Sequence, residues 1–172
     1  DGPGADETAA MVAKAGRRAR AYRVDVSDED AVLKLYTDLA GGFGTVDILV
    51  NNAGICPTTP VLDIRAAEWD RVLGVNLRSV FLMSREAFRL MRERRAGKIV
   101  NIASIAAKTG GLVAGSHYSA SKAGIVAFSK SLALAAAPFK VNVNVVCPGP
   151  TATPMTDAWG AETNAAFVAK IP

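Results

Sequence analysis

Residues 46–54 read VDILVNNAG, an apolar run followed at once by two amides and a glycine. A short run rich in β-branched residues is typical of a strand that is buried on both faces. Similar runs recur along the chain, and longer stretches with helical spacing of apolar residues separate them. We expect strands at Arg20–Val24, Val46–Val50, Lys98–Ile102 and Val141–Val146. We expect helices at Asp28–Leu39, with its N-cap at Ser27 or Asp28 and its end at Gly41-Gly42, at Asn76–Arg94 and at His117–Ala136.

The alternation of strands and helices predicts an α/β fold. In this class a doubly wound parallel sheet carries helices on both faces. A chain of 172 residues fits one domain, and no linker divides it, so we expect residues 1–172 to form a single unit. Half of the residues are hydrophobic and 21% are charged, which is ordinary for a globular protein and excludes a disordered chain.

Composition also excludes several classes of function. No apolar run approaches the roughly 20 residues that cross a bilayer, and no signal peptide is evident. The net charge of +4 is too small to require a nucleic-acid partner. Two cysteines, Cys56 and Cys147, and one histidine make neither a disulfide framework nor a set of metal ligands. We therefore expect a cytoplasmic protein with reduced thiols and without a metal, a membrane partner or a nucleic-acid partner.

Polar or turn residues follow each predicted strand. Asp25 follows the first, Asn51–Gly54 the second, Ser104 the third and Pro148-Gly149 the fourth. The carboxyl ends of parallel strands meet at one edge of the sheet, where open α/β sheets bind ligands. We therefore expect a ligand site at this edge, although turns must follow strands in any fold.

Tyr118 and Lys122 are four residues apart in a predicted helix, which places them on one face. A free tyrosine has a pKa of about 10. A unit charge about 4 Å away contributes about 4 kcal/mol at an effective dielectric constant of 20, enough to bring that pKa to about 7. The pair therefore predicts an acid/base tyrosine, and the alternative is an exposed tyrosine beside a solvated lysine. Ser104, after a buried strand, is placed to hydrogen-bond a carbonyl oxygen as charge develops on it.

An ordered set of short motifs carries a family resemblance. In chain order they are Asn51-Asn52-Ala53-Gly54, Asn76, Ser104, Tyr118-x-x-x-Lys122, Pro148-Gly149 and Thr153. At these separations the set resembles the short-chain dehydrogenase/reductase family, including its reductases of carrier-bound acyl groups. The resemblance extends over essentially the whole chain and implies a Rossmann-like dinucleotide-binding domain.

The resemblance implies hydride transfer between NAD(P)(H) and a carbonyl compound or a secondary alcohol. Tyr118 would be the general acid/base, and Lys122 would lower its pKa and hold the nicotinamide ribose. Ser104 would orient the substrate carbonyl, and Asn76 would fix a water that links Lys122 to a proton relay. These four residues are the implied catalytic set. The implied cofactor-binding residues are Asp25, Val26, Asn52, Ala53, Gly54, Tyr118, Lys122, Pro148, Gly149, Thr151 and Thr153.

The family's Gly-rich pyrophosphate turn is not found in the chain. The glycines of Gly42-Phe43-Gly44 precede a strand rather than follow one. We therefore expect a partial domain that lacks the N-terminal β-α-β unit and the C-terminal helix and strand. Asp1 lies at or just beyond the family's ribose-binding acid, which favours NAD, with NADP as the alternative. A second hypothesis is a dinucleotide-binding sensor or fragment of the same fold without catalysis.

Three further features leave alternatives open. His117 either lines the substrate pocket or lies at an exposed helix start. The basic residues Arg85, Arg89, Arg92, Arg94, Arg95 and Lys98 form either a solvated face near a helix C-terminus or a docking surface for an acidic carrier protein. The stretch Thr153–Phe167 either closes over substrate or packs into the core or a subunit contact. The resemblance also implies a homodimer or homotetramer that pairs the helices Asn76–Arg94 and His117–Ala136.

Overall fold

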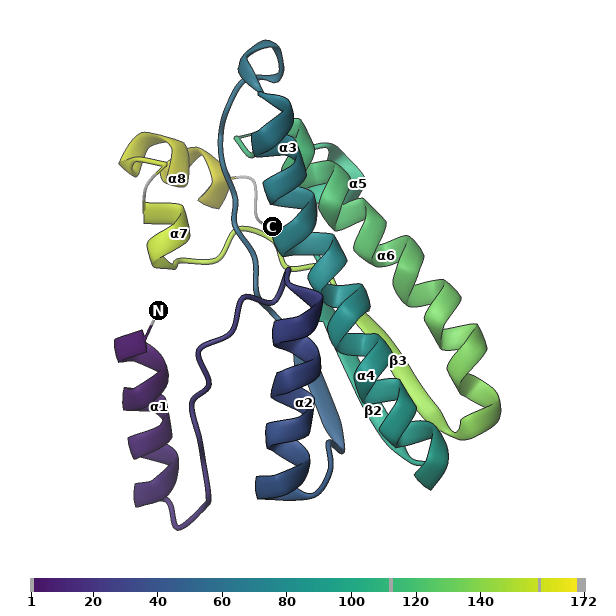
Figure 1. Ribbon diagram of the computed structural model, residues 1–172. Helices are drawn as coiled ribbons and strands as arrows, with labels where there is room; N and C mark the ends of the chain where they lie inside the picture. The colour runs from purple at the N-terminus through teal and green to yellow at the C-terminus, as the bar shows by residue number, and fades with distance from the viewer. Residues whose placement is uncertain (1, 112, 158, 170–172) are drawn as a thin grey trace.

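The computed structural model describes residues 2–111, 113–157 and 159–169. It contains a three-stranded parallel sheet, as the α/β class predicts. The strand order is β1 (Ile48–Asn51), β2 (Gly97–Ile102) and β3 (Val141–Val146). One face of this sheet is covered by α2 (Glu29–Phe43), α4 (Ser79–Arg94) and α6 (Ser116–Ala136) (Figure 1).

The hydrophobic core lies between these helices and the sheet. Leu49 is opposite Ile99 in the register, and Ile99 is opposite Val143. Their side chains pack with Val32, Leu82, Ala87, Met91 and Ala136 of the three covering helices. Because side chains alternate along a strand, Ile48 and Val50 point to the other face, where they are 60% and 56% exposed.

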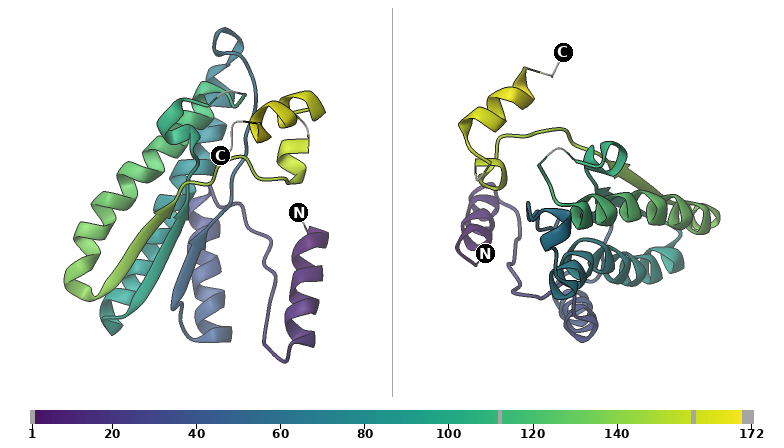
Figure 2. Two further views of the ribbon diagram at one scale, coloured as in Figure 1. Left: turned by 180° about the vertical axis from the view of Figure 1, so that it is seen from behind. Right: turned by 90° about the horizontal axis from the view of Figure 1, so that it is seen from above.

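The predicted strand Arg20–Val24 is not a strand in the structure. Its backbone is extended, but within the described residues no strand lies beside it to supply the hydrogen bonds of a ladder. This extended segment runs between α1 (Gly2–Lys14) and α2, so that α1 lies on the opposite side of it from α2 (Figure 2). Helices α1 and α2 therefore lie on opposite sides of this segment, as in a Rossmann-like fold (Figure 2). Asp1 lies outside the described residues.

Helix α2 begins where the sequence predicts but ends later. The Asp28 carboxylate accepts a hydrogen bond from the Ala31 N–H at 2.7 Å, which makes Asp28 the N-cap. Gly41 and Gly42 remain helical. The end comes at Gly44, whose φ of 84° favours glycine and whose N–H bonds to Ala40 O.

The second predicted helix is the last part of a longer one. Helix α3 (Ala66–Leu73) continues through a π turn at Gly74–Arg78 into α4. The π turn contains Asn76, and such turns are frequent at functional sites. The short helices α5 (Ala106–Thr109), α7 (Pro154–Asp157) and α8 (Ala161–Val168) and the 3-10 turns Val61–Asp63 and Ala137–Phe139 complete the described elements.

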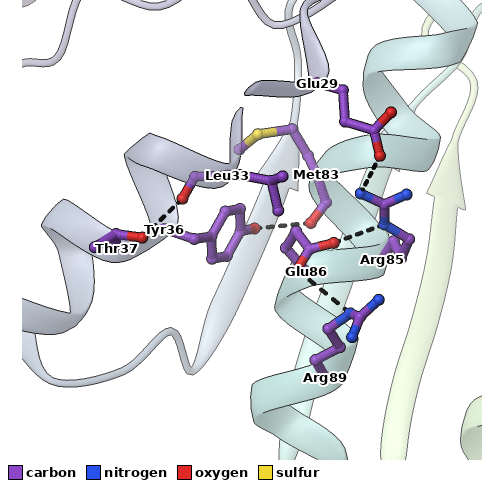
Figure 3. A network of polar contacts seen from close by, with 8 residues as sticks. All are labelled: Glu29, Leu33, Tyr36, Thr37, Met83, Arg85, Glu86 and Arg89. Atoms are coloured by element: carbon purple, nitrogen blue, oxygen red, sulfur yellow. Dashed lines mark hydrogen bonds and ion pairs between the residues drawn. The ribbon is translucent and has the colours of Figure 1, made fainter. Parts of the chain in front are cut away.

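A polar network joins α2 to α4 (Figure 3). Arg85 pairs with Glu29 at 2.8 Å and with Glu86 at 2.6 Å, and Arg89 lies 3.4 Å from Glu86. The phenol of Tyr36 donates to the Met83 carbonyl at 2.7 Å, and burial raises the pKa of Tyr36. The charges of Arg85 and Arg89 in the middle of α4 are thus partly neutralised by carboxylates of the same chain.

The same pairing continues at the C-terminal end of α4. The Arg94 guanidinium contacts the Asp47 carboxylate, Arg95 donates to Pro138 O at 2.9 Å, and Arg92 lies over the Phe139 ring. These contacts favour the interpretation of the basic cluster as a solvated, internally paired face over the interpretation as a docking surface.

Candidate active site

Ser104 follows β2 at the carboxyl edge of the sheet. Two backbone hydrogen bonds hold this corner against the end of β3: Ala103 N–H to Val146 O at 2.8 Å and Ile105 N–H to Pro148 O at 2.9 Å. The Ser104 hydroxyl accepts from the Ala106 N–H at 3.1 Å, which leaves its own proton free to be donated. The predicted residues Ser104 and Pro148 therefore lie at one corner.

Tyr118 and Lys122 lie in the first two turns of α6. The Lys122 Nζ atom is 5.6 Å from the centre of the Tyr118 ring and donates to the Ile102 carbonyl at 2.9 Å. Lys122 is only 5% exposed, whereas Tyr118 is half-buried. The end of β2 thus supplies both Ser104 and the carbonyl that anchors the lysine.

The pKa shifts of this pair differ from the sequence-based expectation. Burial raises the pKa of Tyr118, and the hydrogen bond with the Ser104 side chain works against that rise. Burial also lowers the pKa of Lys122. The predicted lowering of the Tyr118 pKa by Lys122 is therefore wrong for the chain alone. The reason is that burial destabilises the phenolate by more than the neighbouring groups stabilise it.

Asn76 links the loop after β1 to α6. Its side chain is fully buried, accepts from the Ile55 N–H at 2.8 Å, and donates to Ile55 O at 2.9 Å and to Ser121 Oγ at 3.0 Å. The family resemblance implies that Asn76 fixes a water of a proton relay. In the structure its amide is engaged by the loop and by the residue next to Lys122, so that it positions both.

The strand-end surface fits a dinucleotide. A Cβ atom on Gly54 would lie 3.4 Å from Asn76 Oδ1 and 3.6 Å from Lys122 Nζ, so the backbone at Gly54 lies close to the ammonium. Of the three N–H donors of Lys122, the structure engages one in a hydrogen bond within its described residues, to Ile102 O. The other donors can bind ribose hydroxyls.

A hollow lies beside the end of β1, where the loop that leads to Gly54 begins. It is lined by Val26, Val50, Asn51, Asn52, Ala53, Ser79 and Met83. Three of the predicted cofactor-binding residues are thus brought together there. Asp25 lies next to this hollow in sequence, is exposed, and accepts hydrogen bonds from the Ser27 N–H and hydroxyl, which hold the pKa of its carboxyl below the usual range.

The remaining predicted cofactor residues follow β3. Gly149, Thr151 and Thr153 are exposed. Thr151 O accepts from the Thr156 hydroxyl of α7 at 2.9 Å, and the Thr156 hydroxyl oxygen in turn accepts from the Thr153 N–H at 3.0 Å. These contacts order the start of α7 rather than reach the Tyr118–Lys122 pair.

The two cysteines lie near Lys122 and are free thiols. Burial raises the pKa of Cys56 to about 11, so it is mostly protonated at neutral pH and a weak nucleophile. Cys147 packs against the cluster of Val80, Ala103 and Ile125.

His117 is fully buried, so the structure places it neither in an exposed helix start nor in an open pocket. Its Nε2 atom lies 3.0 Å from Oε1 of Glu68 in α3, and the Thr59 hydroxyl donates to the same oxygen at 2.7 Å. Sequence reasoning missed Glu68 and Thr59, and no local pattern marks residues so far from His117 in the chain.

Comparison with known proteins gives a match to the model of the short chain dehydrogenase family over residues 3–164. The chain belongs to the short chain dehydrogenase family. The 3-oxoacyl-[acyl-carrier-protein] reductase FabG of Haemophilus influenzae is 37% identical over 163 residues, 95% of this chain and 67% of the relative. The cis-4-hydroxycyclohexanecarboxylate dehydrogenase of Sinomonas cyclohexanicum is 39% identical over 170 residues, 98% of this chain and 68% of the relative.

Solved structures of short chain dehydrogenases share the fold. A short-chain type dehydrogenase/reductase from Mycobacterium marinum superposes with a TM-score of 0.91 at 33% identity, over 96% of this chain and 66% of that one. An NAD+-bound xylitol dehydrogenase gives 0.85 at 32% identity, over 91% and 60%. The chain spans about two thirds of the length of these relatives. Their names favour an oxidoreductase over a sensor without catalysis.

The described residues contain neither of two other kinds of site. No helix among them combines the length and the apolar character that a bilayer requires. No group of three or more histidine, cysteine, aspartate or glutamate residues lies together where it could hold a metal ion, within those same residues.

Proposed function

We propose that this chain carries the reactive part of an NAD(P)-dependent oxidoreductase that interconverts a carbonyl compound and the corresponding secondary alcohol. The observation that supports this most is the position of the Tyr118 ring beside the buried ammonium of Lys122, with the Ser104 side chain close enough to lower the pKa of the phenol. An acid, a hydrogen-bond donor and a cation at one strand edge suit a carbonyl oxygen that gains charge and then a proton.

Each residue has a defined part in the proposed reaction. In the reducing direction Ser104 donates to the carbonyl oxygen, and Tyr118 transfers its phenolic proton to that oxygen. Lys122 stabilises the phenolate that remains, and Asn76 holds the loop after β1 against α6. In the oxidising direction the phenolate takes the proton from the alcohol.

A nicotinamide cofactor, when bound, supplies or accepts the hydride. We propose that Lys122 and Tyr118 hold its ribose, and that Asp25, Val26, Asn52, Ala53 and Gly54 bind the adenosine side. Pro148, Gly149, Thr151 and Thr153 would flank the nicotinamide. NAD is our first choice and NADP the alternative, since one solved relative has NAD+ bound.

The substrate class remains a carbonyl compound or secondary alcohol of small size. The names of the relatives include a reductase of carrier-linked 3-oxoacyl groups and a dehydrogenase of a hydroxylated ring acid. Both names describe oxidation or reduction at a carbon that bears oxygen. A panel that includes both kinds of compound, followed by nicotinamide absorbance with each cofactor, would identify the substrate.

We further propose that the protein is a homodimer or homotetramer that pairs α4 and α6 with those of a second copy. Phe81 of α4 is 42% exposed and meets Phe128 of α6 edge to face, with the ring centres 6.2 Å apart. Apolar area of this kind on adjacent helices is typical of subunit contacts.

Tyr118→Phe tests the acid/base assignment. The variant keeps the ring but cannot transfer a proton, so we expect kcat to fall by a factor on the order of 10²–10⁴ while the cofactor still binds in a fluorescence titration. Tyr22→Phe is the matched control, since the Tyr22 phenol oxygen has no hydrogen-bond partner among the described residues. Appreciable turnover by Tyr118→Phe would refute the assignment.

A further inference from the structure

His117 precedes Tyr118 in α6 and is joined to two distant segments of the chain. Its imidazole is fully buried, and Nε2 lies 3.0 Å from Glu68 Oε1. The Thr59 hydroxyl donates to the same carboxylate oxygen at 2.7 Å. Thr59 lies in the loop after β1 and Glu68 in the first turn of α3. We refer to Thr59, Glu68 and His117 as the clamp.

The roles of the atoms in the clamp follow from their chemistry. The Glu68 carboxylate is an acceptor, so His117 donates from Nε2, and both the imidazole N–H and the Thr59 O–H converge on one oxygen. These hydrogen bonds hold the pKa of Glu68 below its usual range, which keeps it ionised and able to accept both. His117 Nδ1 has no hydrogen-bond partner among the described residues, so the imidazole is held through Glu68 alone.

Close packing around Gly115 supports the same geometry. A Cβ atom on Gly115 would overlap the His117 ring and lie 3.1 Å from Thr59 O. The Gly115 N–H donates to Pro57 O at 2.9 Å, a second tie between the loop after β1 and the start of α6. Glycine at this position therefore lets the loop and the imidazole share one small space.

Tyr118 lies between two such ties. The clamp holds the residue before it, and Asn76 holds Ser121, three residues after it, through a 3.0 Å hydrogen bond. Both ties run to the loop that follows β1, the loop that also brings Gly54 toward Lys122. We propose that His117 is a positioning residue, which acts through Glu68 and Thr59 to set the placement of the Tyr118 phenol against Ser104 and Lys122.

This inference rests on the proposed function for its kinetic consequence but not for its structural one. A misplacement of about 1 Å at a reacting group can cost about a hundredfold in rate. We therefore expect His117→Ala and Glu68→Ala to lower kcat by a factor between roughly 10 and roughly 100, with KM for the cofactor nearly unchanged. The double variant should be no slower than either single variant, because both break the same tie.

Conservative variants separate the hydrogen bond from the charge and the bulk. In His117→Gln the side-chain amide can still donate to Glu68, and in Glu68→Gln the amide oxygen can still accept from both partners. We expect each to restore most of the kcat that the alanine variants lose. Gly115→Ala should behave like His117→Ala, since the new methyl group displaces the imidazole. Glu29→Ala, which removes an ion-paired carboxylate of α2, is the matched control and should leave kcat unchanged.

The decisive readout is the phenol of Tyr118 itself. The chain has three tyrosines and one histidine, so ¹³C-tyrosine and ¹⁵N-histidine labelling give few signals, and Tyr118→Phe identifies the Tyr118 signal. We expect His117→Ala to shift the Tyr118 signal and its titration, with return toward the wild-type titration in His117→Gln. The imidazole should carry its proton on Nε2 and respond to Glu68→Gln but not to Glu29→Ala.

Three outcomes decide the proposal. A His117→Ala protein that melts at a lower temperature but keeps the wild-type Tyr118 titration and kcat overturns it, as does a His117→Gln protein that is as impaired as His117→Ala. If His117→Ala does not fold, Thr59→Val removes one arm of the clamp from the loop side and answers the same question. If the Tyr118 titration responds to the clamp variants while the wild-type protein shows no turnover, the proposed function fails and the clamp stands.

Discussion

At the scale of single residues, burial rather than the neighbouring lysine decides the charge of Tyr118. Its pKa is raised, because the ring is half-buried and the phenolate loses hydration. The Lys122 ammonium lies 5.6 Å from the ring centre and is itself destabilised by burial. A protonated phenol at neutral pH suits the reducing direction, in which Tyr118 must give up a proton.

The raised pKa predicts opposite pH profiles for the two directions. Reduction requires the phenol, so kcat/KM, which reports groups of the free enzyme, should be flat around neutral pH and fall as pH rises through the phenol's pKa. Oxidation requires the phenolate, so its kcat/KM should rise over the same alkaline range. Cys56 has a pKa of about 11, so Cys56→Ser separates its titration from that of Tyr118. A reduction rate that already falls between about pH 6 and about pH 8, one unit each way from neutrality, would contradict the prediction.

At the scale of elements, buried amides join the sheet to its covering helices. Asn51 donates to Ser84 Oγ at 2.9 Å and to Asn101 Oδ1 at 2.7 Å, and Asn101 donates to Ser129 Oγ at 2.8 Å. One chain of hydrogen bonds thus links α4, β1, β2 and α6 directly beneath the strand ends that carry the site. These hydrogen bonds therefore fix the positions of α4 and α6 relative to β1 and β2 near Ser104 and Tyr118.

Asn101→Ala should expose the contribution of this chain. The change removes two hydrogen bonds and leaves buried polar groups with fewer partners, so we expect the free energy of unfolding to fall by about 2 kcal/mol. Urea denaturation followed by circular dichroism measures it. Asn142→Ala is the matched control, because Asn142 is an exposed residue of β3 and should cost less than about 0.5 kcal/mol. Equal losses for the two variants would contradict a special role of the network.

At the scale of the whole molecule, three helices cover one face of the sheet and leave their own outer surfaces available. The T-shaped pair of Phe81 and Phe128 lies between α4 and α6, and Arg85 lies over the Phe81 ring. The basic cluster on α4 is largely paired with acids of the same chain, so charge does not oppose the approach of a second copy there.

Phe81→Arg should weaken the proposed subunit contact. A buried guanidinium without a partner is costly at an apolar interface, so we expect light scattering after size exclusion to report a smaller assembly than for the wild-type protein. Leu62→Arg is the control, since Leu62 is 95% exposed in the 3-10 turn Val61–Asp63, away from α4 and α6. An unchanged mass for Phe81→Arg would argue against pairing through this face.

Local sequence accounts for most of the site. The apolar runs, the Asp28 cap and the spacing of Tyr118 and Lys122 are properties of adjacent residues, so they predict β1 to β3, the start of α2 and the face of α6 that carries the pair. The boundaries are less accurate, because α2 continues through Gly41 and Gly42 and ends only at Gly44, whose positive φ forms the cap.

Contacts between distant residues decide the rest. Whether Arg20–Val24 is a strand depends on a neighbour, and its extended backbone alone makes no ladder. The rise in the Tyr118 pKa and the burial of His117 depend on the residues that surround them in space. The sequence by itself determined which groups stand at the strand ends, because hydrophobic periodicity and turn chemistry are local. Only the tertiary structure decided their charge and their partners, because desolvation and hydrogen bonding act between segments as far apart as Glu68 and His117.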